Sequence, residues 1–153
     1  MPKIDIGKVL VDASSLYPAQ FRKVVDGRQR QRLGNAAGLT QFGVNLTRLK
    51  PGAASALRHW HENEDEFIYV VEGEITLVTD AGRQKLGPGM AAGFPAGKAD
   101  GHQLVNETDK PVLYREIGDR TPGESASYPD DDLAMHSVDG KFVFTHKDGS
   151  PFK

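Results

Sequence analysis

The sequence predicts an all-β protein, a single-domain antiparallel β-barrel or jelly roll. Two observations predict this fold. Short stretches alternate between apolar and polar residues with a period of two, as half-buried strands do. Glycine (17 residues) and proline (9 residues) fall between these stretches, mostly in short turn-like groups. Closely spaced turns between strand-length segments are typical of antiparallel sandwiches and barrels and not of βαβ folds.

The length of 153 residues suits one domain with a buried core. We expect a single domain over residues 1–153, with its core at about 38–118. Residues 1–37 would form an N-terminal arm, and 119–153 a C-terminal tail packed on the barrel.

The composition excludes several classes of function. A formal net charge of −2 provides no basic field for nucleic acid or an anionic membrane. No apolar run has the length of a membrane span, and the start MPKIDIGKVL lacks the order of a signal peptide. Cysteine is absent, which excludes disulfides and thiolate chemistry and agrees with the cytoplasmic location that we expect. Any bound metal must therefore be held by nitrogen and oxygen.

The first forty residues are mixed in character. A short strand is compatible with 9–11, and a helical turn broken at Pro18 with 14–21. The basic run RQRQR at 28–32 is predicted to be a solvated loop, because it is short and lacks the interleaved aromatic residues of a nucleic-acid site. A strand is predicted within 38–49.

The segment 56–61 (ALRHWH) is the most informative strand. Alternation places Leu57, His59 and His61 on one face. The two imidazoles then project the same way, about 6.5–7 Å apart along the backbone. This separation suits two ligands of one ion, whereas Arg58 and Trp60 would face away from it.

The next strand is predicted at 66–73. Glu66 shares a face with Ile68 and Val70, so a carboxylate stands at the start of a core strand. The other carboxylates of the preceding turn, 62–65, are expected to be solvated.

The remaining core segments follow the same pattern. A hairpin is predicted at 75–86 around Gly82, and two more strands within 91–118. In the first of these two, His102 shares a face with Leu104. In the tail, only 141–146 resembles a strand, and His136 and His146 are expected to be solvated.

The stretch RHWHENEDEF allows three interpretations: a solvated acidic turn, a structural accident, or half of a metal site. A lone inward histidine is more often a satisfied core residue than a ligand. Here three of the five histidines lie on inward faces near strand ends, which favours the metal site. A GxSxG nucleophile motif and a Walker-type phosphate loop are both absent.

Two motifs resemble those of the cupin superfamily. The first has the form G, then HxH, then E after four residues, then G; the second has the form G-x5-P-x-G…H-x3-N. They are carried by Gly52, His59, His61, Glu66 and Gly73, and by Gly89, Pro95, Gly97, His102 and Asn106. Gly52 precedes His59 by one residue more than usual, and the loop between Gly97 and His102 is longer than usual. The chain also resembles small single-domain bacterial cupins of the sugar-phosphate-isomerase-like type.

This resemblance implies a cupin jelly roll (a double-stranded β-helix), frequent pairing into homodimers, and one divalent transition metal per chain. The four implied metal ligands are His59, His61, Glu66 and His102. Mn, Fe, Ni, Co, Cu and Zn all accept these ligands.

The expected function is that of a metal-dependent enzyme of isomerase, lyase or dioxygenase type. Its substrate would be a small oxygen-rich metabolite, such as a sugar phosphate or an oxo or hydroxy acid. The alternative is a non-catalytic, ligand-binding sensor. No residue stands out as a general base, and Arg48 and Lys98 are the cations expected nearest the barrel mouth.

Overall fold

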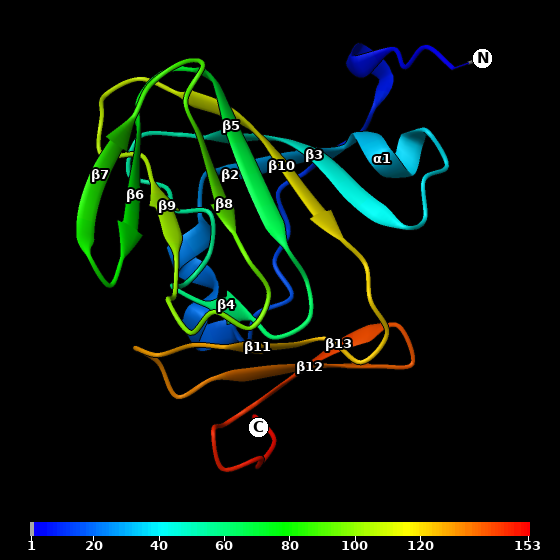
Figure 1. Cartoon of the computed structure of the whole chain (residues 1–153), viewed down its shortest axis with the longest axis vertical. Coiled ribbons are helices and arrows are strands. Elements are labelled where there is room, and N and C mark those ends of the chain that lie inside the picture. The colour runs from blue at the N-terminus through cyan, green and yellow to red at the C-terminus, as the bar shows by residue number, and fades with distance from the viewer. Residues whose placement is uncertain (1) are drawn as a thin grey trace.

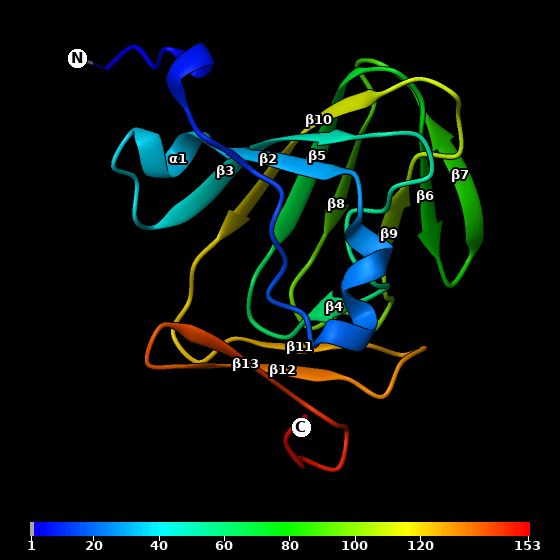
Figure 2. The same ribbon diagram turned by 180° about the vertical axis from the view of Figure 1, so that it is seen from behind.

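The computed structural model describes residues 2–153 and is mostly β, with antiparallel pairing throughout its sheets (Figures 1 and 2). The helical segments are the 3₁₀ helices η1 (Ile6–Lys8) and η2 (Ala19–Val25) and the α-helix α1 (Leu33–Ala36). The strands are β1 (Val11–Asp12), β2 (Arg28–Arg32), β3 (Phe42–Leu49), β4 (Trp60–His61), β5 (Glu66–Glu72), β6 (Ile75–Thr79), β7 (Gly82–Leu86), β8 (Ala91–Phe94), β9 (Gln103–Val105), β10 (Val112–Asp119), β11 (Ser125–Ser127), β12 (Ala134–Val138) and β13 (Lys141–Thr145). No helix within residues 2–153 is long and apolar enough to cross a membrane.

The strands form three sheets instead of the closed barrel that was expected. Their orders are β1-β2-β3-β10-β5-β8, β13-β12-β11-β4 and β7-β6-β9. The segment before β4 approaches β9 only through single bridges, Ala54 with Val105 and His59 with His102. Because these bridges do not continue into a ladder, the described strands enclose the interior without closing a barrel.

Several predicted elements are confirmed. The hairpin at 75–86 is β6 and β7, and the strand from Glu66 is β5, with Ile68 and Val70 both fully buried. The helical turn expected near Pro18 is η2, which begins directly after this proline.

Three other predictions need correction. The run 28–32 is not a loop but strand β2, which pairs with β3, and its first residue, Arg28, is buried. The segment 91–118 holds three strands, because Ala91–Phe94 pairs with β5 as β8. The tail contains β11, β12 and β13, and β11 pairs with β4. The pairings of β2 with β3, of β8 with β5 and of β11 with β4 are not between adjacent hairpin strands, and local alternation carries no information about them.

Two clusters of buried side chains lie on either side of the predicted site. One lies between the six-stranded and three-stranded sheets and contains Leu49, Ala53, Ile68, Val70, Ile75, Leu77, Leu104, Val112 and Tyr114. The other joins η2 to the C-terminal strands and contains Tyr17, Val25, Ala56, Ala126, Tyr128, Leu133 and Met135. The C-terminal strands lie below the large sheet in Figure 1 and form the floor of the second cluster.

Gly73 is a position where only glycine fits. Its φ is +82°, and a Cβ there would lie 2.8 Å from the carbonyl oxygen of Pro111. Gly52 also has a positive φ, of +83°, but an added Cβ would meet nothing within 4 Å.

We therefore expect Gly73→Ala to destabilise the protein more than Gly52→Ala. Both variants bear the cost of a left-handed residue, about 1–2 kcal/mol, and only Gly73→Ala adds an overlap with backbone. Urea unfolding of both variants measures the difference. Equal losses in the free energy of unfolding would show that the Pro111 contact relaxes without cost.

Candidate functional site

His59 is held opposite His102 by their backbones. The His59 amide donates to the His102 carbonyl at 3.1 Å, and the His102 amide donates to the His59 carbonyl at 2.8 Å. His61 follows two residues later in β4, on the same side of the chain. This pair of backbone hydrogen bonds brings the ligands predicted from the first motif, His59 and His61, next to the ligand predicted from the second motif, His102.

Glu66 begins β5 and is paired with Phe94 on one side and Gly118 on the other. The carboxylates of the preceding turn, 62–65, were expected to be solvated, but two of them form hydrogen bonds within the protein. Asp65 Oδ1 accepts a hydrogen bond from the Ala96 amide at 2.7 Å, and Glu64 Oε1 accepts one from the Thr121 amide at 2.9 Å. These carboxylates fix the turn and hence the start of β5.

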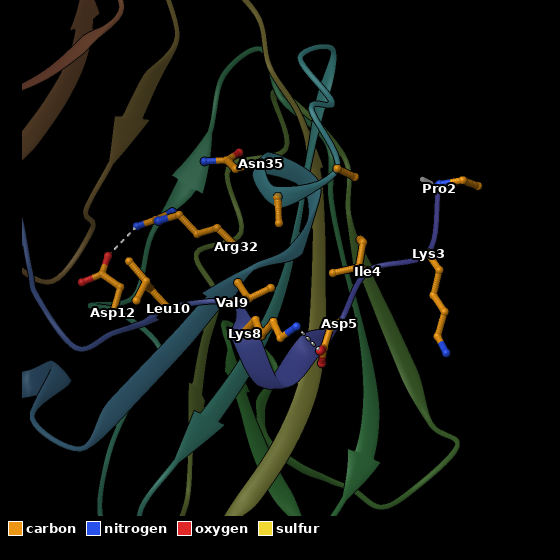
Figure 3. A pocket seen from close by; sticks show the side chains of 12 residues that line it. Pro2, Lys3, Ile4, Asp5, Lys8, Val9, Leu10, Asp12, Arg32 and Asn35 are labelled. Carbon is orange, nitrogen blue, oxygen red and sulfur yellow. Dashed lines mark hydrogen bonds and ion pairs between the residues drawn. The ribbon is translucent and has the colours of Figure 1, made fainter.

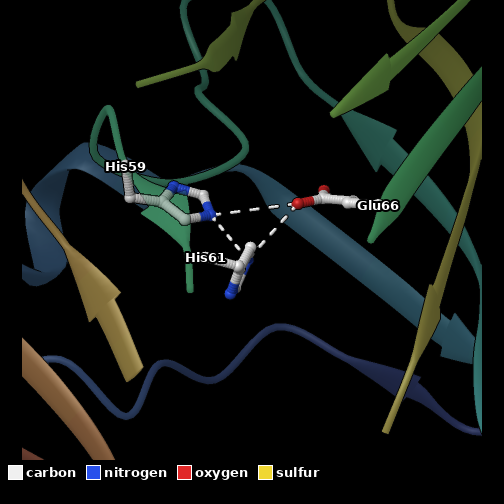
Figure 4. A group of neighbouring side chains, drawn as sticks. All are labelled: His59, His61 and Glu66. Atoms are coloured by element: carbon white, nitrogen blue, oxygen red, sulfur yellow. Dashed lines mark hydrogen bonds and ion pairs between the residues drawn. The ribbon is translucent and has the colours of Figure 1, made fainter. Parts of the chain in front are cut away.

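The side chains of all four predicted residues converge. Glu66 Oε2 lies 2.9 Å from His102 Nε2, 3.4 Å from His61 Nε2 and 4.0 Å from His59 Nε2. Figure 4 shows the side chains of His59, His61 and Glu66 turned toward one another. The two Nε2 atoms of His59 and His61 are 3.2 Å apart. Three imidazole nitrogens therefore surround one carboxylate oxygen.

The protonation of His59 follows from its surroundings. Burial lowers its pKa to about 3, so the ring is neutral near pH 7. Its Nδ1 lies 2.8 Å from the carbonyl oxygen of Leu57, which can only accept a hydrogen bond. Nδ1 therefore carries the proton, and Nε2 directs its lone pair toward Glu66.

Glu66 is ionised in this arrangement. Burial opposes its charge, but hydrogen bonds from His102 and His61 outweigh the burial and hold the pKa of the carboxyl well below its usual value. Burial likewise opposes a charge on His61, and the same contact with Glu66 raises the pKa of that imidazole.

Aromatic rings from both core clusters hold the imidazoles in place. Phe94 stacks on His102 with 3.6 Å between ring centroids and an angle of 6°. Tyr128 stacks on His59 at 5.7 Å and 30°. The site is thus supported from above by β8 and from below by the C-terminal segment.

The structure also reveals one residue that the sequence did not indicate. Glu124 is 1% exposed and lies with Glu64 near His61, all three offering donor atoms within 4.8 Å of one another. Its Oε1 accepts hydrogen bonds from the amides of Asn63 and Ser125. A single glutamate in a polar tail has no sequence signal, because only the pairing of β11 with β4 brings it inside.

The donor set fits a divalent transition metal. The donor atoms of His59, His61 and Glu66 lie within 4.8 Å of one another, and His102 joins them through Glu66. The separations of 3.2–4.0 Å among the first three agree with neighbouring ligands on bonds of about 2.0–2.2 Å. The neutral imidazole of His59 already directs a lone pair into this space. These four side chains are therefore capable of holding one ion.

A cavity of about 220 Å³ adjoins the histidines. Among its lining residues are His61, His102, Trp60 and Lys98. Trp60, which was expected to face away from the metal ligands, is thus among the residues around this cavity. Lys98 lies where a cation was expected.

The other predicted cation, Arg48, lies elsewhere, and so does Arg58, which was expected to face away from the site. Arg48 is exposed on the outer face of β3, because its neighbours Thr47 and Leu49 are the buried ones. Arg58 is 15% exposed and forms ion pairs with Asp80 and Asp130.

The remaining features lie away from this centre. His136 is exposed, as predicted, whereas His146 is half-buried and paired with Asp132 at 2.7 Å. A second cavity of about 700 Å³ lies between the N-terminal segment and α1 (Figure 3). Its wall includes the ion pair of Arg32 with Asp12, and none of the four converging residues lines it.

Comparison with known proteins identifies the fold. A family model described as Cupin domain matches residues 45–118. A sugar phosphate isomerase of a cupin superfamily from Silicibacter pomeroyi is 48% identical, with 99% of this chain and 97% of that chain covered and a TM-score of 0.96. A putative sugar phosphate isomerase from Acidithiobacillus ferrooxidans is 25% identical, with 90% and 96% covered and a TM-score of 0.74.

A third structure, the polyketide cyclase RemF from Streptomyces resistomycificus, is 22% identical, with 78% of this chain and 79% of that chain covered and a TM-score of 0.65; it shares the fold. No curated protein sequence matches the chain. The near-complete superposition on the Silicibacter structure, together with the matched domain, shows that this chain belongs to the cupin superfamily.

Proposed function

We propose that this protein is a metal-dependent enzyme that acts on a small oxygen-rich metabolite in the cytoplasm. Its metal ligands would be His59, His61, Glu66 and His102. The observation that carries the proposal is the convergence of three imidazole Nε2 atoms on one carboxylate oxygen. The donors are nitrogen and oxygen alone, which suits Mn, Fe, Ni, Co, Cu or Zn.

The chemistry that such a metal supplies when bound is polarisation of a substrate oxygen. The chain itself orients the ligands. The Leu57 carbonyl selects the tautomer of His59, and Phe94 sets the ring plane of His102. Glu66 contributes the negative charge that keeps the donor set basic.

An isomerase or lyase acting on a sugar phosphate has the best support among the possible reactions. The 48%-identical Silicibacter protein is a sugar phosphate isomerase by name, and the Acidithiobacillus protein is a putative one. Oxo and hydroxy acids also offer a metal two neighbouring oxygen atoms, one from the carboxylate and one from the oxo or hydroxyl group. They are therefore the second group of candidate substrates.

We expect purified wild-type protein to hold about one divalent metal ion per chain. His61→Ala should reduce metal affinity by a factor on the order of a hundred or more, since even residues that only support a ligand contribute about 10–100-fold. Elemental analysis after dialysis measures retention. His136→Ala removes an exposed histidine and is the matched control. Equal metal content in wild type and His61→Ala would contradict the assignment.

The carboxylate ligand can be identified separately. Glu66→Gln should lose the metal, whereas Glu64→Gln should retain it, because Glu64 is engaged with the Thr121 amide. Retention by Glu66→Gln and loss by Glu64→Gln would move the site to the group formed by His61, Glu64 and Glu124.

The reaction class is tested by incubating metal-loaded protein with sugar phosphates and with oxo and hydroxy acids, with and without oxygen. We expect a sugar phosphate to be rearranged in the absence of oxygen, and His61→Ala to lose this turnover. Consumption only in oxygen would indicate a dioxygenase instead. A compound that raises the melting temperature and is recovered unchanged would support the non-catalytic sensor.

We also propose a homodimer, with the partner on the outer face of the six-stranded sheet. Phe42, Phe67 and Tyr69 lie on this face and are 42%, 43% and 38% exposed. Large exposed apolar patches mark interaction surfaces. Arg58 is occupied by its ion pairs with Asp80 and Asp130 and is not part of this face.

Light scattering should therefore give twice the chain mass of 16.7 kDa at micromolar concentration. Tyr69→Glu should shift the protein to monomer, because it buries a charge in the interface. Val138→Glu, at an exposed residue of the C-terminal sheet, is the control and should leave the mass unchanged. A monomeric wild type would refute the dimer.

A further inference from the structure

Strand β2 brings two arginines to the inner side of the large sheet. Arg28 is committed to structure: it donates to the carbonyls of Ser55 at 2.7 Å and Ser14 at 3.1 Å. Arg30 lacks such backbone partners among residues 2–153. Its one ion pair is with Glu116, with Nε 3.4 Å from Oε2, and the two side chains are 18% and 19% exposed.

The register of the sheet places Arg30 on the face that carries Glu66. Arg30 pairs with Thr47 on β3, and Thr47 pairs with Tyr114 on β10. Residues two apart on a strand share a face, so Glu116 and Gly118 follow Tyr114 on this side. Gly118 in turn pairs with Glu66. Arg30 therefore faces the same interior as the proposed metal ligands.

This inner face has unsatisfied hydrogen-bonding groups. The Nε of Arg30, the hydroxyls of Thr47 and Tyr114 and the Oε2 of Glu116 are buried and have no hydrogen-bond partner among the described residues. Thr47 and Tyr114 are both 0% exposed. Arg30 Nε and Glu116 Oε2 face each other across the ion pair at 3.4 Å, whereas the Thr47 and Tyr114 hydroxyls have no partner among the described residues. Buried polar groups are normally paired, so these two hydroxyls call for a ligand or ordered water.

The charges of this interior also leave room for an anion. Arg28 and Arg30 balance Glu66 and Glu116. A divalent ion bound by Glu66 and three neutral imidazoles would add two positive charges, which is more than the single carboxyl of Glu124 beside His61 can offset. Burial opposes the charge of Arg30, but the carboxylates of Glu116 and Glu66 outweigh the burial and raise its pKa, so the guanidinium keeps its charge.

We infer that Arg30 is the anion-recognition residue of this site. Its guanidinium binds a carboxylate or phosphoryl group of the substrate, while the remainder of the substrate reaches toward Glu66 and the histidines. Glu116 occupies the guanidinium when no ligand is bound, and the Thr47 and Tyr114 hydroxyls provide further hydrogen bonds. This inference rests on the proposed function and defines its substrate class as small anions.

Arginine suits this role because its planar fork binds two oxygens of a carboxylate or phosphate at once. The alternative is an ion pair of Arg30 and Glu116 that serves stability alone. The two cases differ in the effect of removing Glu116. If Glu116 competes with the anion for Arg30, removing Glu116 strengthens anion binding. If Glu116 only stabilises the fold, removing it leaves anion binding unchanged or weaker.

The test is calorimetric titration of metal-loaded full-length protein with malonate, with methyl phosphate, and with uncharged malonamide. Arg30→Gln should weaken binding of the anions about ten- to a hundredfold, the usual effect of losing a hydrogen bond to a charged group. Glu116→Gln should strengthen it several-fold. Arg48→Gln removes the same charge from the outer face of the neighbouring strand and should have no effect. Malonamide should not bind.

Tight binding of malonate alone would assign the subsite to carboxylates, and binding of methyl phosphate alone to phosphoryl groups. Equal anion affinity in wild type and Arg30→Gln, or no binding of either anion to wild type, would overturn the inference while the metal content stands. Absence of metal in wild type would instead refute the proposed function. If Arg30→Gln does not fold, Glu116→Gln decides alone, and unchanged or weaker binding there overturns the inference.

Discussion

The contact between the Glu66 carboxylate and three imidazole rings constrains the rest of this structure. An ionised carboxylate inside a protein costs several kcal/mol unless positive or hydrogen-bonding partners compensate it. Here His102 at 2.9 Å and His61 at 3.4 Å provide that compensation. His61 lies in β4 and Glu66 in β5, whereas His59 and His102 form the bridge just before β4 and β9. These segments must therefore meet at one point for the carboxylate to be accommodated.

The two hydrophobic clusters hold the imidazole rings in place from opposite sides of the site. Phe94 packs on the upper cluster and stacks on His102, while Tyr128 belongs to the lower cluster and stacks on His59. Each ring has one packed face, which restricts its rotation and keeps its nitrogen directed at Glu66. The C-terminal strands are therefore part of the site's support, although they lie outside the matched Cupin domain.

Next to this centre, the inner face of the large sheet carries polar side chains on β2, β3 and β10, namely Arg30, Thr47, Tyr114 and Glu116. Leu49, Val112 and Val70 lie at one end of this face and Glu116 and Glu66 at the other. Apart from Arg28, which pairs with Leu49, the apolar end of this face belongs to the hydrophobic core, and the polar end lies toward the proposed metal ligands. This arrangement allows buried charge next to the site without weakening the packing that supports the fold.

The sequence by itself determined the β class, the strand from Glu66, the hairpin at 75–86, and the four residues that converge. Strand alternation and turn residues act over a few positions, so they specify which side chains share a face. Only the tertiary structure decided that 28–32 is an inner strand, that the sheets do not close, and that Glu124 and Tyr128 reach the histidines. These features depend on pairing between segments far apart in the chain, and that pairing is set by burial and register, which leave no local pattern.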